Sequence, residues 1–132
     1  MTLSLDEKRA IIAYRKQKAY TSLQEANDVA KLGHWNLAAN RLYYAAYYMA
    51  SALLIDKGFK AQSHSGVIHL IGLHFITKNL LSRDFGRLFS RLYEMRQSGD
   101  YDDMFDFTEE EITPYFSKTL DFVKAIENLI TL

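Results

Sequence analysis

The stretch from Leu42 to Ile55 constrains the fold more than any other part of this sequence, because it is apolar nearly all round a helix. Ser51 is its only plainly polar residue. A helix without a polar face lies in the interior of a protein. The stretch is too short to cross a bilayer, which takes about 20 apolar residues. It therefore predicts the central, almost wholly buried helix of a bundle, ending at Lys57 and Gly58, where a glycine stops the helix.

The composition excludes several classes of protein. The chain has 132 residues, and its 16 basic residues balance 16 acidic ones, so no overall charge attracts nucleic acid or anionic lipid. Any nucleic-acid contact would have to use a local patch. The chain has no cysteine, which excludes disulfides, thiolate metal sites and cysteine nucleophiles. The N-terminal MTLSLDEKRAII shows no secretory signal, so we expect a cytoplasmic protein with no membrane contact.

Helix signals on both sides of the central stretch predict further helices. Capping boxes occur at Ser4–Glu7 and Thr108–Glu111. In a capping box, the side chain of a serine or threonine and that of a following glutamate each accept a hydrogen bond from the backbone amide of the other residue. Ser63 is another expected N-cap. The predicted helices cover 5–32, 37–57, 64–77, 83–98 and 109–130, with an ordered loop at 99–107. The expected fold is all-α, an up-and-down bundle of four long helices plus a shorter one, forming a single domain over residues 1–132.

Pro114 conflicts with a helix that simply starts at Thr108. A proline lacks an amide hydrogen, so it either kinks the first turns or occupies the first helical position, with Thr113 as the N-cap. Both alternatives stay open from the sequence.

The spacing of His64, His69 and His74 argues against a metal site. Two ligands on one helix face lie four residues apart, whereas a step of five turns each ring about 140° from the last. No metal and no cofactor are therefore expected. His64 differs from the other two because it follows the Ser63 cap at a helix N-terminus, where backbone amides attract anions. It is either bonded to a neighbouring side chain or part of an anion site.

Arg96 is the most informative charged residue. It continues the apolar stripe of Leu88 and Leu92, and Asp100 and Tyr101 follow one turn later. A guanidinium in this position either pairs with a carboxylate such as Asp100 or binds phosphate in a pocket or interface. The same helix carries the only concentrated basic ridge of the sequence, formed by Arg83, Arg87 and Arg91.

Several segments, taken together and in this order, resemble the HEPN domain family. They are LQEA (23–26), ANRLYYA (39–45), LLIDKG (53–58), SHSGV (63–67) and LYEMR (92–96), followed by Asp100 and Tyr101. The resemblance extends over residues 5–130. It implies a bundle of four main helices and a homodimer or a complex with a partner. For small prokaryotic members, it implies the toxin half of a toxin–antitoxin pair, with a minimal nucleotidyltransferase as the antitoxin.

Many proteins of that family are metal-independent ribonucleases, whose motif is an arginine followed four to six residues later by a histidine. Arg96 matches the arginine, but Tyr101 stands where the histidine is expected, and no histidine follows His74. The resemblance therefore assigns phosphate binding to Arg96, with Tyr101, Asp100 or His64 assisting. Three functions stay open: a toxin acting on RNA, a non-catalytic module that binds a nucleotide or a partner protein, and a purely structural dimer. We expect the first.

Overall fold

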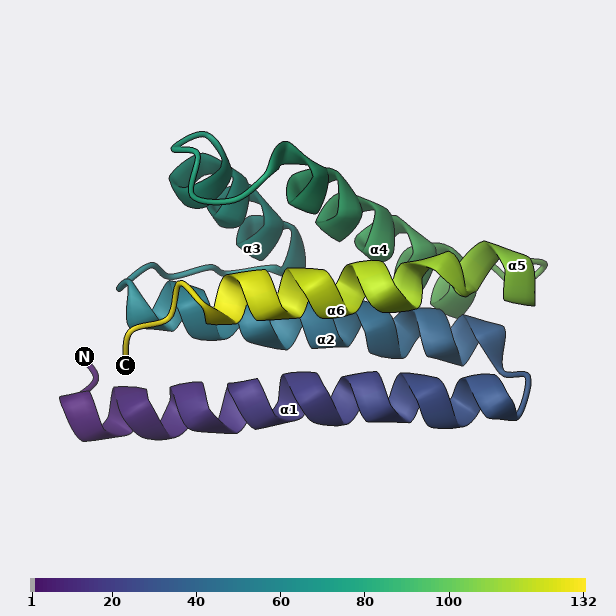
Figure 1. The fold of residues 1–132 in the computed structure, drawn as a ribbon, viewed down its shortest axis with the longest axis horizontal. Coiled ribbons are helices and arrows are strands. Elements are labelled where there is room, and N and C mark those ends of the chain that lie inside the picture. The colour runs from purple at the N-terminus through teal and green to yellow at the C-terminus, as the bar shows by residue number, and fades with distance from the viewer. Residues whose placement is uncertain (1) are drawn as a thin grey trace.

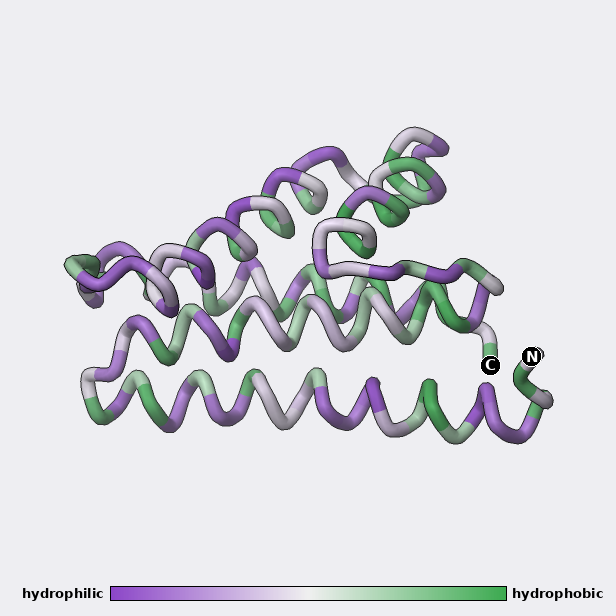
Figure 2. Tube along the Cα trace, turned by 180° about the vertical axis from the view of Figure 1, so that it is seen from behind, coloured by the Kyte–Doolittle hydropathy of each residue, from purple (hydrophilic) through white to green (hydrophobic). Residues whose placement is uncertain are grey.

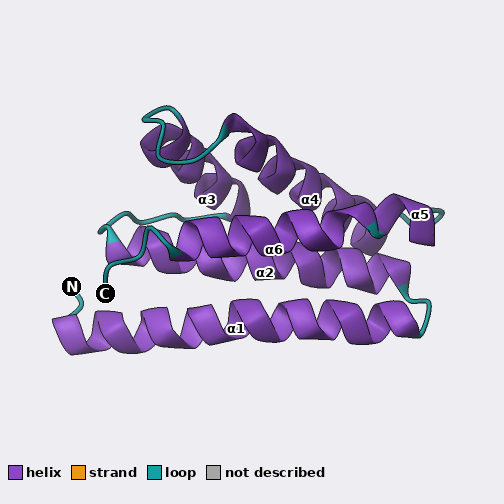
Figure 3. Cartoon of the chain, in the orientation of Figure 1, coloured by secondary structure: helices purple, strands orange, loops and turns teal. Residues whose placement is uncertain are grey.

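The computed structural model describes residues 2–132, and over that range it consists of helices and loops without a strand (Figures 1 and 3). The four longest helices alternate in direction along the chain, and the two termini lie at the same end of the molecule (Figure 1). The elements are α1 (Leu5–Lys31), α2 (Trp35–Asp56), α3 (His64–Ile71), the π-helix η1 (Gly72–Ile76), α4 (Arg83–Tyr101), α5 (Glu109–Ile112) and α6 (Pro114–Glu127). The expected all-α up-and-down bundle is confirmed. Within residues 2–132, no helix combines the length and the apolar character that a membrane crossing needs.

The apolar stretch forms α2, the central helix. α1 packs along one side of α2, whereas α3 and α4 lie on the opposite side and α6 runs beside it (Figure 1). Every residue from Met49 to Leu54 is buried, as predicted. Tyr44, Tyr47, Tyr48 and Ile55 differ from the prediction, because they are only half-buried. A phenol keeps its hydroxyl near water or polar partners, and these three rings form the edge of the core.

The remaining core is contributed by stripes on the other helices. Hydrophobic residues recur at helical intervals along α1 (Figure 2), which brings Ala19, Leu23 and Ala26 into the core. α4 contributes Leu88, Phe89, Leu92 and Met95, and α6 contributes Phe122, Val123 and Ile126. Arg96 follows directly on the α4 stripe, so the sequence placed it correctly at the edge of the core.

The predicted helix ends are confirmed where the capping signals were strongest. Ser4 and Glu7 form a reciprocal capping box, and Ser63 accepts a hydrogen bond from the Gly66 amide. Gly33 and Gly58 have φ angles of 80° and 81°, a left-handed conformation that glycine adopts without strain.

The predicted third helix changes its hydrogen bonding after Ile71, which no sequence signal indicated. η1 continues it as a π-helix, in which backbone bonds span one residue more than in an α-helix. Ile76 of η1 packs against α4 at Gly86, where a Cβ atom would lie only 2.7 Å from Ile76 Cδ1. The glycine therefore permits the close approach of η1 to α4.

α4 continues to Tyr101, beyond its expected end at Ser98. Asp100 and Tyr101 consequently lie on the same helix as Arg96 rather than in a loop. The loop expected at 99–107 is therefore shorter than predicted and begins only after Tyr101, the last residue of α4.

This shorter loop is held in place by Asn36, at the start of α2. The Asn36 side-chain amide donates to the carbonyl oxygen of Phe105 at 2.9 Å and accepts from the amide of Phe107 at 2.8 Å. Phe107 is buried. The loop is therefore ordered, as expected, because one asparagine satisfies two of its backbone groups.

The last predicted helix is interrupted between Ile112 and Pro114. Thr108 and Glu111 form the predicted capping box, but it starts only the single turn α5. α6 begins with Pro114 at its first position, which agrees with the second of the two alternatives. Thr113 makes no side-chain capping bond.

Candidate functional site

The Arg96 guanidinium contacts the side chains of Tyr44, Tyr101 and Asp100. Its Nη2 atom donates hydrogen bonds to the hydroxyl oxygens of Tyr44 at 3.0 Å and Tyr101 at 3.1 Å. Its Nε atom lies 3.3 Å from Asp100 Oδ2. Only 12% of the Arg96 side chain is exposed. Asp100 and Tyr101 reach it because residues four and five positions on lie about one turn further along a helix.

A chain of polar contacts fixes the Asp100 carboxylate from α2. Asn40 Nδ2 donates to Asp100 Oδ2 at 2.7 Å. The Asn40 oxygen in turn accepts from Arg41 Nη2 at 2.7 Å, and Arg41 Nη1 pairs with Glu25 of α1 at 3.2 Å. Three helices thus hold the carboxylate that faces Arg96 Nε. The structural pairing considered for Arg96 is present, but it occupies only one edge of the guanidinium.

The two tyrosine hydroxyls keep their own hydrogens available. Each accepts a bond from Arg96 Nη2, and within residues 2–132 neither Tyr44 nor Tyr101 has another hydroxyl partner. Within the described residues, Arg96 Nη1 makes only one long contact, 3.5 Å to Gln97. Tyr101 is 68% exposed, so the cluster is open to solvent. Convergent O–H and N–H donors around a cation suit an oxyanion such as a phosphate group.

His64, at the start of α3, contacts the tyrosines of α2. Its Nδ1 atom lies 2.7 Å from the Tyr43 hydroxyl, and its ring stacks on Tyr47 with centroids 4.4 Å apart. Burial, and secondarily the Arg96 cation, lower the pKa of His64 below its ordinary value. The imidazole is therefore neutral near pH 7.

His64 and Arg96 share a pair of neighbours. The His64 ring centroid lies 5.8 Å from that of Tyr43 and 5.9 Å from that of Tyr44. The Arg96 Cζ atom lies 5.7 Å and 5.4 Å from the same two rings. The fold therefore brings together all four predicted site residues. We refer to Arg96, Tyr44, Asp100, Tyr101 and His64 as the Arg96 cluster.

The other histidines take no part in this cluster. His74 stacks on Phe59 with centroids 4.0 Å apart, and His69 is exposed. Across the described part of the chain, no three histidine, aspartate or glutamate side chains are grouped as metal ligands.

Sequence reasoning missed Tyr44, Tyr43 and Asn40 as parts of the site. Tyr43 is fully buried, and burial raises the pKa of its hydroxyl, so it remains a neutral hydrogen-bond partner of His64. One signal could have identified Tyr44: it lies on the same helical stripe as Arg41, and the Arg41 Cζ atom lies 5.0 Å from its ring centroid.

Comparison with known proteins adds an independent finding. A family model described as "HEPN domain" matches residues 12–129. A "UPF0332 protein" of Thermotoga maritima is 35% identical over 126 residues, which is 96% of each chain. Two proteins of Methanocaldococcus jannaschii are also similar. "Putative toxin MJ0142" is 30% identical over 72% of this chain and 65% of its own length. "Putative toxin MJ0605" is 36% identical over 48% of each chain.

Proposed function

This chain belongs to the HEPN domain family, and from that premise we propose that it is the toxin component of a toxin–antitoxin pair and acts on RNA at the Arg96 cluster. One observation carries the proposal. Arg96 Nη2 is shared between the Tyr44 and Tyr101 hydroxyls, which leaves both O–H groups free to donate to a ligand. The names of the two Methanocaldococcus jannaschii relatives support a toxin.

The cluster has the groups that cleavage of RNA without a metal requires. Arg96 and the two tyrosine hydroxyls would bind the non-bridging oxygens of a phosphodiester and stabilise the charge that develops there. Neutral His64 would accept the proton of the ribose 2′-hydroxyl as its oxygen attacks the adjacent phosphorus. The bond from phosphorus to the 5′-oxygen breaks, water supplies the proton to that oxygen, and a 2′,3′-cyclic phosphate remains.

The tautomer of His64 decides whether it can accept this proton. Its Nδ1 atom faces the Tyr43 hydroxyl. If Nδ1 carries the hydrogen and donates to the Tyr43 oxygen, Nε2 has a free lone pair and acts as the base. If Tyr43 donates instead, Nε2 carries the hydrogen and can only donate to the phosphate.

A second candidate function is a non-catalytic module that binds a nucleotide or a partner protein through the same cluster. Tyr101, in place of the motif histidine, favours this alternative, because a neutral phenol is a much poorer proton acceptor near pH 7 than an imidazole. The pairing of Arg96 with Asp100 at 3.3 Å favours it too, since it reduces the charge available to a phosphodiester.

For its assembly, we propose a cytoplasmic homodimer formed around the end of α4, with a minimal nucleotidyltransferase as the antitoxin. Tyr101, at the end of α4, and Met104, in the loop after it, are both exposed, and Met104 is 94% exposed. Exposed aromatic and methionine side chains are enriched at protein interfaces.

The proposal is tested by mixing the purified protein with single-stranded RNA and mapping the ends of the products. We expect fragments with 2′,3′-cyclic phosphate ends from the natural protein and none from Arg96→Ala or His64→Gln. Binding without cutting would establish the non-catalytic alternative. The toxin function is wrong if the natural protein neither binds nor cuts RNA or a nucleotide.

A further inference from the structure

A groove between α4 and α6 is lined by none of the residues of the Arg96 cluster. It is a hollow of about 520 Å³ with an apolar floor of Phe85 and Leu88. Its remaining lining combines one aromatic ring with three cations and two carboxylates: Tyr115, Arg87, Arg91, Lys118, Asp84 and Asp121. We call this hollow the α4–α6 groove.

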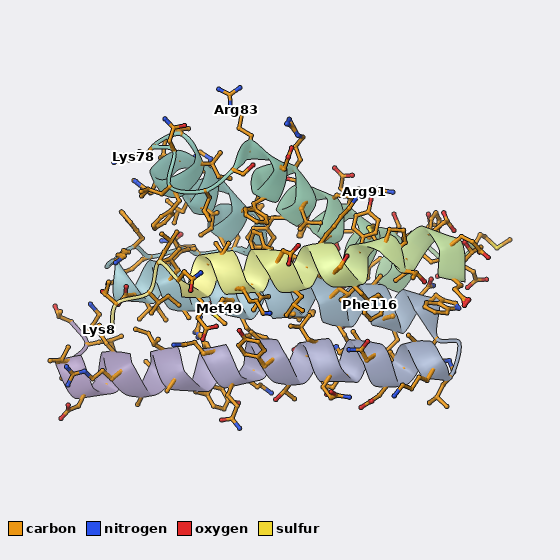
Figure 4. All side chains as sticks on the ribbon, in the orientation of Figure 1. Lys8, Met49, Lys78, Arg83, Arg91 and Phe116 are labelled. Carbon is orange, nitrogen blue, oxygen red and sulfur yellow. The ribbon has the colours of Figure 1, made fainter. Side chains whose placement is uncertain are left out.

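The cations of the groove continue along α4. Arg83, Arg87 and Arg91 are spaced four residues apart, which places them about 6 Å from one another along one flank of the helix. All three line an adjoining hollow of about 600 Å³. The labelled Arg83 and Arg91 side chains project from α4 on the side of the molecule away from α1 (Figure 4).

Tyr115 connects the cations on the two helices. Arg91 and Tyr115 line the groove together, and the nearby Tyr115 hydroxyl raises the pKa of Arg91. The Lys118 Nζ atom lies 5.3 Å from the centre of the Tyr115 ring, a cation–π contact. An aromatic ring fixed between an arginine and a lysine can stack with a base while the cations contact phosphates.

The carboxylates near the groove form only weak pairs. Asp84 lies 3.2 Å from Arg87, and Glu94 lies 3.5 Å from Arg91. In both pairs more than half of each side chain is exposed, and such pairs contribute about 0–1 kcal/mol. A phosphate can therefore replace the carboxylate. Four cations (Arg83, Arg87, Arg91, Lys118) face three carboxylates (Asp84, Glu94, Asp121), which leaves a small positive excess in a chain that is neutral overall.

We propose that the α4–α6 groove binds a flanking segment of single-stranded RNA. Proteins that hold single strands combine a positively charged groove with aromatic rings on which bases stack, and this groove has both. The inference rests on the proposed function for its ligand, but it uses none of the residues of the Arg96 cluster.

The position of the groove fits a single strand that passes around α4. Arg91 and Arg96 are five residues apart, which separates their directions by about 140° around the helix axis. On a helix about 10–12 Å thick, an arc of about 140° is about 13 Å long, and five residues rise about 7.5 Å along the axis. The path over the surface is therefore about 15 Å, which roughly four to five stacked nucleotides span at about 3.4 Å each. One strand can therefore place a phosphate at Arg96 and its neighbouring nucleotides in the groove.

The test is the affinity of a fluorescein-labelled oligouridylate, measured by fluorescence anisotropy over a series of KCl concentrations. Arg87→Ala/Arg91→Ala should weaken binding about tenfold and lower the slope of log Kd against log[KCl] by about 1.4, since each phosphate contact on a single strand contributes about 0.7. Tyr115→Leu should weaken binding without changing the slope, because stacking carries no charge. Arg9→Ala/Lys31→Ala removes two exposed cations from α1 and should bind like the natural protein.

The other possible results show whether the groove proposal or the proposed function fails. If Arg96→Ala weakens binding and Arg87→Ala/Arg91→Ala binds with the natural affinity and slope, the groove proposal is overturned and the proposed function stands. The groove would then be a surface for an acidic protein. If the natural protein does not bind the oligonucleotide at all, the groove proposal fails. The proposed function fails with it only if the protein also neither binds nor cuts any other RNA or a nucleotide.

Discussion

Arg96 Nη2 donates a hydrogen bond to the hydroxyl of Tyr44 at 3.0 Å, across the interface between α4 and α2. The centre of the Tyr44 ring lies 5.0 Å from the Arg41 Cζ atom, and the ring is edge-on to that of His64. Tyr44 therefore connects the predicted phosphate-binding arginine with the predicted base. No loop is needed to form the site, because both contacts come from residues on helices.

Tyr44→Phe should weaken RNA binding while leaving the fold intact. The change removes a hydroxyl that accepts from Arg96 and can donate to a phosphate, but it keeps the ring in place. We expect a loss of unfolding free energy of about 0.5–1.5 kcal/mol, the usual contribution of one hydrogen bond. Urea denaturation and anisotropy measure the two effects.

Tyr48→Phe is the matched control for this change. Tyr48 is half-buried on the same helix, and its hydroxyl has no hydrogen-bond partner within residues 2–132. It should behave like the natural protein in both measurements. Equal RNA affinity for the two phenylalanine variants would exclude the Tyr44 hydroxyl from the site.

His64 should titrate below its ordinary pKa of 6.5, and Arg96→Gln should raise that pKa. Burial disfavours the imidazolium, and the Arg96 cation repels it, so removing the cation relieves the second effect. The C–H signals of the imidazole, followed by NMR against pH, measure the change directly. Arg83→Gln, at the other end of α4, should leave the titration of His64 unchanged; an equal shift in both variants would contradict a specific effect of the Arg96 charge on His64.

The same lowered pKa makes stability depend on pH. Below pH 6.5 the unfolded chain protonates its His64 before the folded protein does, so the unfolded state binds more protons. The free energy of unfolding therefore falls as the pH drops from 6.5 through the lowered pKa of the folded state. His64→Gln should lack this part of the pH dependence in urea titrations.

Asp56→Asn should release the C-terminal residues. The Asp56 side chain is fully buried and accepts hydrogen bonds from the amides of Thr131 at 3.0 Å and Leu132 at 3.1 Å, beside the Lys57 cation. An asparagine would turn one acceptor into a donor that faces these amides, at a cost of about 1–3 kcal/mol. Limited proteolysis should remove the C-terminus of the variant faster than that of Asp103→Asn, in an exposed loop.

This effect has a defined pH dependence. Burial alone would raise the pKa of Asp56, but the hydrogen bonds from the C-terminus and the Lys57 cation lower it below its ordinary 3.8. The stabilisation by Asp56 is therefore complete above pH 3.8 and is lost as the pH falls through the lowered value. The difference between the natural protein and Asp56→Asn should shrink below that pH.

Met104→Asp should convert the proposed homodimer to a monomer. A charge at a side chain that is 94% exposed has no effect on the fold, but it is costly inside an apolar interface. Light scattering at micromolar concentration measures the mass. Leu80→Asp, at an exposed leucine in the turn before α4, should stay dimeric; a monomeric natural protein would contradict the homodimer.

The sequence predicted those features that depend on local signals. The apolar run of α2, the glycine at 58 and the two capping boxes each specify a helix or its end through interactions within a few residues. Arg96 could be identified for the same reason, because a cation on an apolar stripe requires a partner.

What could not be predicted depends on contacts between distant parts of the chain. His64 and Tyr43 are 21 residues apart in sequence, and Asn40 and Asp100 are 60 apart. No spacing rule connects them, so only the packing of α2 against α3 and α4 shows that they meet. No signal in the sequence indicated η1, and the break at Thr113 stayed open. Helix periodicity does not distinguish a π-turn or a one-turn helix from a continuous α-helix.

The central claim, that Arg96 serves a ligand rather than the fold, is tested most directly by measuring RNA affinity and melting temperature on the same preparation of Arg96→Ala. Asn40 donates to Asp100 at 2.7 Å, and this bond does not depend on the guanidinium, so we expect a nearly unchanged melting temperature. Affinity should fall about 10- to 100-fold, equivalent to about 1.4–2.7 kcal/mol. Arg96→Lys should recover only part of it, because an ammonium lacks the planar fork. Natural RNA affinity in Arg96→Ala, or a variant that simply unfolds, would contradict the claim.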